Sequence, residues 1–436
     1  MNRAHILAFA AALALAFFSG CTGEKEPADG KVHVTYWEKW TGFEGDAMRD
    51  TVDAFNASQD RIVVELLTVS QIDQKTLMAA AGGIPPDIAG LWSNDVVSYA
   101  QKRAALPLDE YCEKHGITRS LFIPHFWDMC FYRGSLYAIP TTPATTALHW
   151  NKKLFREAGL DPDSPPRTIE ELDAVAQRLT KREGGKIVQM GFLPAEPGWW
   201  NWAWGYFFGG QLWDGKSRIT CDSPENIKAF EWVQKYAREY GVEALQTFQS
   251  GFGNFSSPQN AFMDGKVAME MQGVWMYNFL DKYAPEVEWG AAPFPHPKDR
   301  PDLANTTVAE EDVVIVPRGA KHPDEAFEFL AFLATHKGSE LLNLGQRKFT
   351  PLLNPTPEFV QEHPNPQIEV FIDLASSPNA VSSPHLSISR EFTGEMANAF
   401  DEIWLCRKTP EQALRDVRVR MQKRLDWEVS RADRLD

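Results

Sequence analysis

The region that follows residue 30 alternates between strand and helix patterns, and this order constrains the fold more than any other feature of the chain. Apolar residues alternate or cluster as in strands over 31–37, 61–67 and 86–91, and they recur at helical spacing over 46–58 and 70–81. Strand, helix, strand, helix, strand is the βαβ order of a parallel sheet with right-handed crossovers. Ligands bind beyond the carboxyl ends of such strands. The sequence therefore predicts an α/β fold with candidate site residues directly after the first and third strands.

A second α/β region is predicted from residue 168 onward. Thr168 and Glu171 form a capping-box pattern at the start of one helix, and Ser223 and Gly241 delimit another. Strand character returns over 312–317, and a further helix begins at residue 322. The length of 436 residues is enough for about two to three domains, so both regions fit in one chain with a large core.

The N-terminus has the features of an export signal. Arg3 precedes an apolar run over 6–18, which is shorter than the about 20 residues that a membrane-spanning helix needs. The run ends in Ser19-Gly20-Cys21, which resembles the lipobox of bacterial lipoproteins and implies cleavage before Cys21 and a lipid on its sulfur. Residues 1–20 are therefore predicted as a lipoprotein signal peptide, and 21–30 as a flexible tether. The other four cysteines leave disulfides and free thiols equally open: Cys112, Cys130, Cys221 and Cys406.

Charge and motif content exclude several classes of function. Lys and Arg number 44 against 59 Asp and Glu, a net charge of −15 that disfavours a nucleic-acid partner. The sequence contains no phosphate-loop, dinucleotide, zincin or hydrolase-elbow motif, and its histidines have no ligand spacing. We therefore expect no catalytic residues, no metal and no cofactor. The triplet Glu310-Glu311-Asp312 could supply a carboxylate pair for glycoside hydrolysis, but adjacent strand residues point to opposite faces, which favours a polar ligand anchor instead.

Tryptophan is unusually frequent, with 15 residues in the chain. Five of them fall within fifteen positions: Trp199, Trp200, Trp202, Trp204 and Trp213. Packing in a core explains Trp202 and Trp204, whereas Trp199 and Trp200 follow a loop, so at least one of these two is expected to line a cleft. Flat aromatic faces with nearby acids and amides suit sugar rings, which have apolar faces and directional hydroxyls.

Several segments together resemble one protein family along nearly the whole chain. They lie at residues 79–92, 106–111, 134–161, 209–234, 262–275 and 313–333. In this order they resemble the bacterial extracellular solute-binding proteins of carbohydrate ABC importers (solute-binding family 1, the maltose- and multiple-sugar-binding type). The chain departs from the family at Ala309-Glu310-Glu311, where a small, Gly-rich approach to the last strand is usual, which suggests an altered ligand or hinge.

The resemblance implies a two-lobe periplasmic-binding-protein fold of type II-like topology. Each lobe is expected to be a mainly parallel sheet flanked by helices, with crossing segments near 140–148, 296–309 and 347–353 as the hinge. The N-terminal lobe would comprise residues 31–142 and 306–348, and the C-terminal lobe residues 143–305 and 349–436. The implied partners are a carbohydrate and the transmembrane permease subunits of an ABC importer with a cytoplasmic ATPase. The chain would act as a monomer, lipid-anchored to the cell membrane and facing the periplasm or the cell exterior.

The resemblance also places ligand-binding candidates in both lobes. They are Trp40, Glu44, Trp92, Asn94, Asp95, Thr142, Trp199, Trp200, Trp275, Glu310 and Arg347. The indoles would stack on sugar rings and the polar groups would bind hydroxyls, and the missing side chain of Gly273 would let a ligand approach the backbone beside Trp275. Two other functions stay open: a receptor of the same fold that feeds a sensor kinase, and an exported glycoside-processing enzyme.

Overall fold

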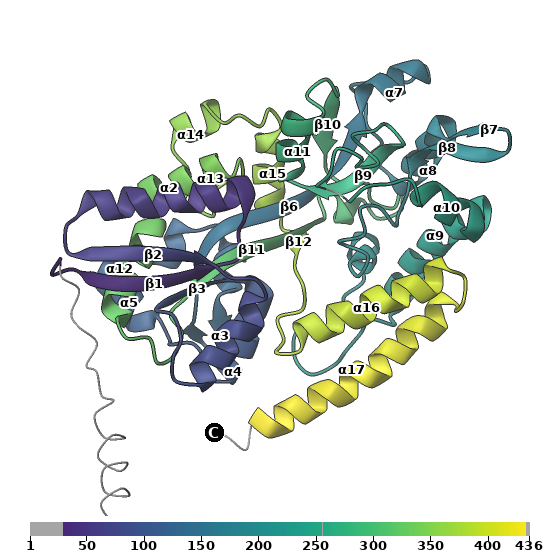
Figure 1. Cartoon of the computed structure of the whole chain (residues 1–436). Helices are drawn as coiled ribbons and strands as arrows, with labels where there is room; N and C mark the ends of the chain where they lie inside the picture. Colours follow the sequence, from purple (N-terminus) through teal and green to yellow (C-terminus); the bar gives the residue numbers. More distant parts are fainter. Residues whose placement is uncertain (1–28, 255, 433–436) are drawn as a thin grey trace, which may run out of the picture.

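The structure, a computed structural model, describes residues 29–254 and 256–432 and shows two α/β lobes joined by a curled sheet (Figure 1). The predicted signal peptide and Cys21 lie outside the described residues. The strands are β1 (Val32–Glu38), β2 (Ile62–Thr68), β3 (Ile88–Trp92), β4 (Phe131–Tyr132), β5 (Ser135–Leu136), β6 (Ile139–Asn151), β7 (Lys181–Glu183), β8 (Lys186–Phe192), β9 (Val267–Gly273), β10 (Trp289–Ala292), β11 (Thr307–Ile315) and β12 (Ala380–Val381).

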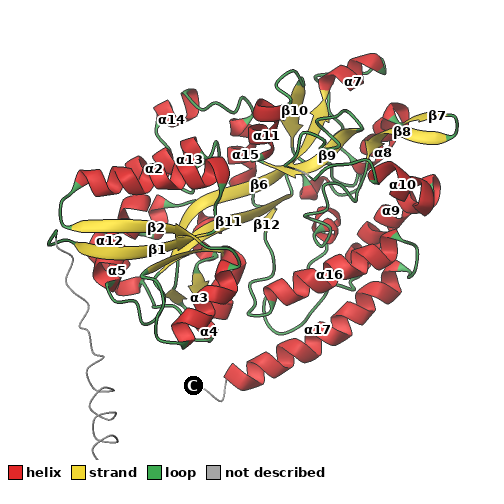
Figure 2. Ribbon diagram, viewed as in Figure 1, coloured by secondary structure: helices red, strands yellow, loops and turns green. Residues whose placement is uncertain are grey.

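Helices cover both lobes (Figure 2). Those associated with the N-terminal lobe are α2 (Gly42–Ser58), α3 (Ile72–Ala81), α4 (Val96–Gln101), α5 (Asp109–His115), α6 (Pro124–Asp128), α12 (Pro323–Leu333), α13 (His336–Gly345) and α14 (Pro357–Gln361). The remaining helices are α7 (Lys152–Glu157), α8 (Ile169–Leu179), α9 (Pro224–Tyr240), α10 (Val242–Gln249), α11 (Met276–Tyr283), α15 (Ile368–Ala375), α16 (Ser389–Trp404) and α17 (Pro410–Ala432). Short 3-10 turns include η1 (Ser93–Asp95) directly after β3.

The sheet runs in the order β2-β1-β3-β11-β6-β9-β8-β7, and β6 belongs to both lobes. Strand β6 pairs with β11 up to Thr145 and with β9 from Thr146 onward. The βαβ region after residue 30 forms parallel pairs as predicted, because β1 is parallel to both β2 and β3. The two-lobe α/β class is thus confirmed, while the pairs β3–β11, β11–β6 and β6–β9 are antiparallel and make the sheet a mixed one.

Two threonines hold the backbone together at the point where β6 changes partner. The hydroxyl of Thr307 donates to the carbonyl of Thr146 at 2.8 Å and accepts from its N–H at 3.1 Å. The hydroxyl of Thr146 accepts from the N–H of Val308 at 3.1 Å. Side-chain hydroxyls therefore satisfy backbone groups that the regular ladder leaves unpaired there.

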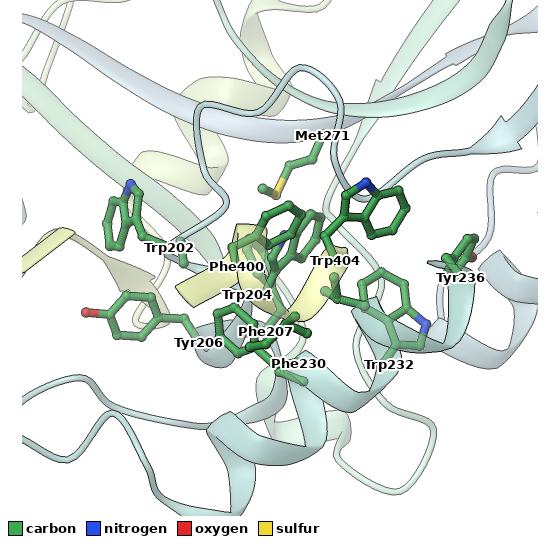
Figure 3. Packing of buried hydrophobic residues seen from close by; sticks show 14 of the residues in the cluster. Trp202, Trp204, Tyr206, Phe207, Phe230, Trp232, Tyr236, Met271, Phe400 and Trp404 are labelled. Atoms are coloured by element: carbon green, nitrogen blue, oxygen red, sulfur yellow. The ribbon is translucent and has the colours of Figure 1, made fainter. Parts of the chain in front are cut away.

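The C-terminal lobe has a core rich in aromatic side chains (Figure 3). Trp204 is 1% exposed and lies at 5.4 Å from Trp232, ring centroid to ring centroid. Helices α16 and α17 close this core through residues such as Phe400 and Met421, both nearly inaccessible. The prediction that Trp204 is a core residue is consistent with this packing, because burying large indoles contributes much of the hydrophobic stabilisation of a lobe.

The local capping predictions are confirmed in the same lobe. The Thr168 hydroxyl accepts from the Glu171 N–H at 3.2 Å, and the Glu171 carboxylate accepts from the Thr168 N–H at 3.4 Å. Gly241 ends α9 with φ of 88°, a value that favours glycine. Strand β11 begins at Thr307, five residues before the predicted strand, inside the segment expected to be a crossing.

The four cysteines that follow Cys21 are free thiols, three of them buried, which answers the open question about disulfides. In the part of the chain that the structure describes, no helix combines the length and the apolar character needed to cross a membrane.

Candidate functional site

A cavity of about 330 Å³ lies between the lobes at the carboxyl ends of β1 and β3. Its walls are formed by Trp40, Glu44, Trp92, Asn94, Ala144, Trp199, Trp200, Trp202, Trp275, Phe279, Glu310, Glu311, Asp312, Lys348, Ser383 and Thr393. The N-terminal lobe contributes the loops after β1 and β3, and the C-terminal lobe contributes the loop after β8 and the turn after β9. The volume is near the lower end of the range for small-molecule sites.

The indole rings of Trp40 and Trp92 in the N-terminal lobe form cation–π contacts with lysine and arginine side chains. The ammonium of Lys39 lies 4.7 Å from the ring centroid of Trp40 and 4.9 Å from that of Trp92. Lys348 lies 4.5 Å from the Trp40 ring, and the Arg390 guanidinium lies 4.7 Å from the Trp92 ring. These cation–π contacts hold both indoles in place. Trp92 is 36% exposed, so part of its surface remains open to a ligand.

The C-terminal lobe contributes a cluster of indoles centred on Trp275. Its ring centroid lies 5.6 Å from that of Trp199 and 6.1 Å from that of Trp200. Trp199 is 49% exposed, whereas Trp202 is 8% exposed and links the cluster to the core of the lobe. A rigid, mostly apolar wall of this kind offers flat surfaces without large losses of side-chain entropy on binding.

Gly273 has a different role from the one predicted. A Cβ atom at this position would lie 2.3 Å from two ring carbons of Trp275, far inside van der Waals contact. The space over the Gly273 backbone is therefore occupied by the Trp275 ring, and the glycine allows that ring to fold back over the end of β9. The expectation that a ligand approaches the backbone there was wrong.

Charged groups on the N-terminal side of the cavity form short ion pairs. Lys348 lies 2.7 Å from Glu44, and Lys39 lies 3.1 Å from Asp312 and 3.3 Å from Glu38. Burial raises the pKa of Asp312, and the neighbouring lysine ammoniums partly offset this effect. Burial lowers the pKa of Lys39, but its two carboxylate partners outweigh that effect and the pKa is raised overall.

Glu310 is held by hydrogen bonds alone. Its Oε1 accepts from the Ser383 N–H at 2.6 Å, and its Oε2 accepts from the Ser93 hydroxyl at 3.2 Å. Desolvation raises the pKa of Glu310 more than these two bonds lower it. Its neighbour Glu311 lies 3.7 Å from the Cys130 sulfur, and burial raises the pKa of Glu311 well above its usual range.

Eight of the eleven predicted site residues line this one cavity: Trp40, Glu44, Trp92, Asn94, Trp199, Trp200, Trp275 and Glu310. The other three do not line it. Asp95 is 4% exposed and bonds to Arg390, and Thr142 is 1% exposed within the β6–β11 ladder. Arg347 has a left-handed backbone with φ of 56° and forms an ion pair with Asp281, while the next residue, Lys348, faces the cavity.

Sequence reasoning missed five lining residues, namely Ala144, Phe279, Lys348, Ser383 and Thr393. It assigned Trp202 to the core and considered Glu311 and Asp312 only as members of an acidic triplet that could anchor a ligand, and all three also line the cavity. Lys348 is adjacent to a predicted residue, and only the turn at Arg347 decides which of the two side chains faces inward. Ser383 and Thr393 come from a region without a recognisable motif. Within residues 29–254 and 256–432, no group of three or more His, Cys, Asp or Glu side chains could hold a metal ion.

Comparisons with known proteins agree on one family. A sequence model described as bacterial extracellular solute-binding protein matches residues 44–340. A putative binding protein of Brucella abortus is 24% identical over 89% of this chain and 91% of its own length. The sn-glycerol-3-phosphate-binding periplasmic protein of Pectobacterium atrosepticum is 22% identical over 95% of each chain. The structure of CpMnBP1 with mannobiose bound superposes with a TM-score of 0.78 at 27% identity, covering 89% of this chain and 99% of that one.

Proposed function

The chain belongs to the bacterial extracellular solute-binding proteins, and we propose that it captures a short carbohydrate in the interlobe cavity and delivers it to the permease of an ABC importer. One observation carries the proposal: six indoles from both lobes line a single cavity together with carboxylates. They are Trp40, Trp92, Trp199, Trp200, Trp202 and Trp275. Sugar rings have apolar C–H faces and polar edges, so this mixture of surfaces complements them.

The affinity of such a site would come mainly from the aromatic surfaces. A micromolar complex needs about −8 kcal/mol. Hydrogen bonds to hydroxyls exchange with water and contribute only about 0.5–1.5 kcal/mol each. Burial of ring faces on Trp92, Trp199 and Trp275, at about 25 cal/mol per Å², would supply much of the remainder. The mannobiose bound by CpMnBP1 supports a ligand of one to a few sugar units.

Capture would involve a rotation of the lobes about the crossing strands. We place the hinge where β6 leaves β11 and joins β9, between Thr145 and Thr146. This position supports a division near residues 142 and 143 and near 306, with lobes of residues 31–142 with 306–348 and 143–305 with 349–436, except that α14 is bonded through Thr356 to Glu340 of the N-terminal lobe. A ligand that contacts indoles of both lobes favours the closed arrangement by its extra contacts there.

Delivery would take place at a membrane. Cleavage before Cys21 and lipidation of its sulfur would anchor the chain, and residues 21–30 would tether the lobes near the permease and its cytoplasmic ATPase. The protein would face the periplasm or the cell exterior. It would release its ligand without chemical change, and the names of relatives as binding proteins support this role.

A saccharide screen tests the proposal. Purified protein that begins after Cys21 would be heated with mannobiose, mannotriose, maltotriose and arabinooligosaccharides, and the unfolding temperature and tryptophan fluorescence recorded. A ligand at 100 times its Kd stabilises the protein by about 2.7 kcal/mol, so a binder gives a clear increase of the unfolding temperature. Recovery of the sugar intact is expected, and hydrolysis by pure protein would refute the binding role. A complete lack of response to all saccharides would refute a carbohydrate ligand.

A further inference from the structure

The cavity has a marked imbalance of charge. Its walls contain four carboxyl groups, Glu44, Glu310, Glu311 and Asp312, and one ammonium, Lys348. Burial raises the pKa of Glu311 well above its usual range, so the negative charge of the walls comes from the other three. Two further cations, Lys39 and Arg390, lie over the rings of cavity tryptophans. The ability of the site to accept an anionic ligand depends on whether any of these three cations is available.

All three cations already have carboxylate partners. Lys348 is paired with Glu44 at 2.7 Å, and Lys39 with Asp312 at 3.1 Å. Their side chains are only 3% and 6% exposed, so both pairs are largely removed from water. The Arg390 guanidinium bonds both oxygens of Asp95, which is itself buried. An anion would have to compete with these internal carboxylates for every cation, and breaking a buried pair leaves an uncompensated charge.

Glu310 is the carboxylate with capacity for a ligand. Each of its oxygens accepts one hydrogen bond, from Ser383 and Ser93, and an ionised carboxylate has about four acceptor positions. Among the ion pairs of the described residues, none includes Glu310. It therefore offers acceptor positions to hydroxyl or ammonium donors and repels a second negative charge. Glu310 itself lines the cavity, so these acceptor positions face the space that a ligand would occupy.

We propose that the ligand is a short saccharide without negative charge, neutral or amino-substituted, and that Glu310 is the residue that rejects acidic and phosphorylated sugars. This inference rests on the proposed carbohydrate function and narrows its substrate class. It separates this chain from its relative named for sn-glycerol 3-phosphate, whose ligand carries a phosphate.

Matched sugar sets test the inference. Mannose and glucose would be compared with mannose 6-phosphate, glucose 6-phosphate, glucuronate and glucosamine, with mannobiose and sn-glycerol 3-phosphate added, by calorimetry at one ionic strength. We expect each acidic or phosphorylated sugar to bind at least 100-fold more weakly than its neutral counterpart, and glucosamine to bind within tenfold of glucose or more tightly. An acidic member that binds more tightly than its neutral counterpart would overturn the inference and leave solute binding intact. A panel with no binder of any charge would overturn the carbohydrate function itself.

The variant Glu310→Gln keeps the size of the side chain and removes its charge. It should decrease the ratio of neutral to acidic affinities by at least tenfold, whereas the exposed Glu362→Gln should leave this ratio unchanged. A folded Glu310→Gln protein, shown by an unaltered circular dichroism spectrum, that keeps the wild-type ratio would assign the discrimination to other groups and contradict the role of Glu310.

Discussion

Arg390 of α16 binds Asp95 of η1 with two hydrogen bonds, at 2.5 Å from Nε and 2.7 Å from Nη2. Asp95 follows β3 in the N-terminal lobe, and α16 packs in the core of the C-terminal lobe. The pair therefore connects the lobes beside the cavity, and the same guanidinium lies over the Trp92 ring. Two-point bonds from arginine to carboxylate are directional, so this contact favours one relative position of the lobes.

The variant Arg390→Gln should weaken ligand binding mainly by increasing the dissociation rate. It removes a contact between the lobes and leaves Asp95 buried without its cation. We expect a loss of about 1–2 kcal/mol, or about tenfold in affinity. Stopped-flow tryptophan fluorescence with a sugar found in the screen measures both rate constants. The double variant Arg390→Gln/Asp95→Asn should lose little more binding free energy than Arg390→Gln alone, because both substitutions remove the same interaction. If the losses of binding free energy in the two single variants add up in the double variant, the two residues contribute to binding independently.

The variants Trp275→Ala and Trp199→Ala should each decrease sugar affinity strongly. Each removes an aromatic surface of the cavity, and truncation of a buried aromatic anchor costs about 2 kcal/mol or more, about thirtyfold in Kd. Trp427→Ala is a matched control, because Trp427 on α17 is 48% exposed, like Trp199 at 49%, and does not line this cavity. Calorimetry on folded variants gives the comparison. Affinities within twofold of wild type would exclude these indoles from the ligand contacts.

The variant Gly273→Ala should weaken ligand binding indirectly, through the position of Trp275, although residue 273 itself does not line the cavity. The added methyl group would collide with the Trp275 ring, so the ring must move out of its position. We expect an affinity loss similar to that of Trp275→Ala, together with a shift of the tryptophan emission before any ligand is added. The substitution Gly394→Ala serves as the control, because nothing lies within 4 Å of a Cβ atom there. Equal affinity of Gly273→Ala and wild type would show that the ring position is unimportant.

The stability of the protein should decline as the pH rises from about 6.5 to 8. Burial raises the pKa of Glu270 to about 8, so the folded chain keeps a proton there that the unfolded chain loses above about pH 4.3. His149, opposite Glu270 in the β6–β9 ladder, has its pKa lowered by burial to about 4, and this destabilises the fold only below about pH 6.5. Above about pH 6.5 the protonation of His149 no longer changes the stability, so the decrease that comes from Glu270 is not offset by His149.

Urea unfolding at pH 6.5 and pH 8 measures this effect. The free energy of unfolding of wild type should decrease by about 2 kcal/mol over this interval from Glu270 alone, at 1.36 kcal/mol per pH unit. In Glu270→Gln the decrease should be smaller by that amount, whatever the absolute stability of the variant. Equal pH slopes for the two proteins would contradict a proton on buried Glu270.

Membrane association should depend on Cys21. The variant Cys21→Ser removes the sulfur that would carry the lipid, so the protein should move from the membrane fraction to the soluble one. Radiolabelled palmitate should mark the wild type and leave the variant unlabelled. A variant that stays with the membrane would mean that another feature anchors the chain.

Much of the fold was predictable because local patterns specify it. Alternating apolar residues predicted β1 and an apolar run predicted β2, and the capping residues Thr168 and Ser223 marked helix starts that the structure confirms. Trp40 and Trp92 could be assigned to the same edge of the sheet because the carboxyl ends of parallel strands meet there, and both line the cavity. These assignments required only short-range sequence information.

The remaining part of the site depends on contacts that the sequence does not reveal. Lys348 reaches the cavity because a left-handed turn at Arg347 redirects the chain. Asp95 does not line the cavity, because its carboxylate binds Arg390, which is almost 300 positions away in the sequence. Gly273 was placed correctly and interpreted wrongly, because the side chain that fills its vacant space is that of its own neighbour, Trp275. Long-range pairing and backbone conformation determine such details, and apolar periodicity does not report them.

The change of partner along β6 has a mechanical consequence. Strand β6 is continuous and pairs with strands of both lobes. Its covalent backbone resists stretching, whereas its φ and ψ angles can change by small amounts, so the strand can twist without becoming longer. The hydroxyls of Thr146 and Thr307 can rotate with this twist and keep their bonds to the backbone. A rotation of the lobes of the kind proposed above would then need only small dihedral changes along β6, and the sheet would stay hydrogen-bonded throughout.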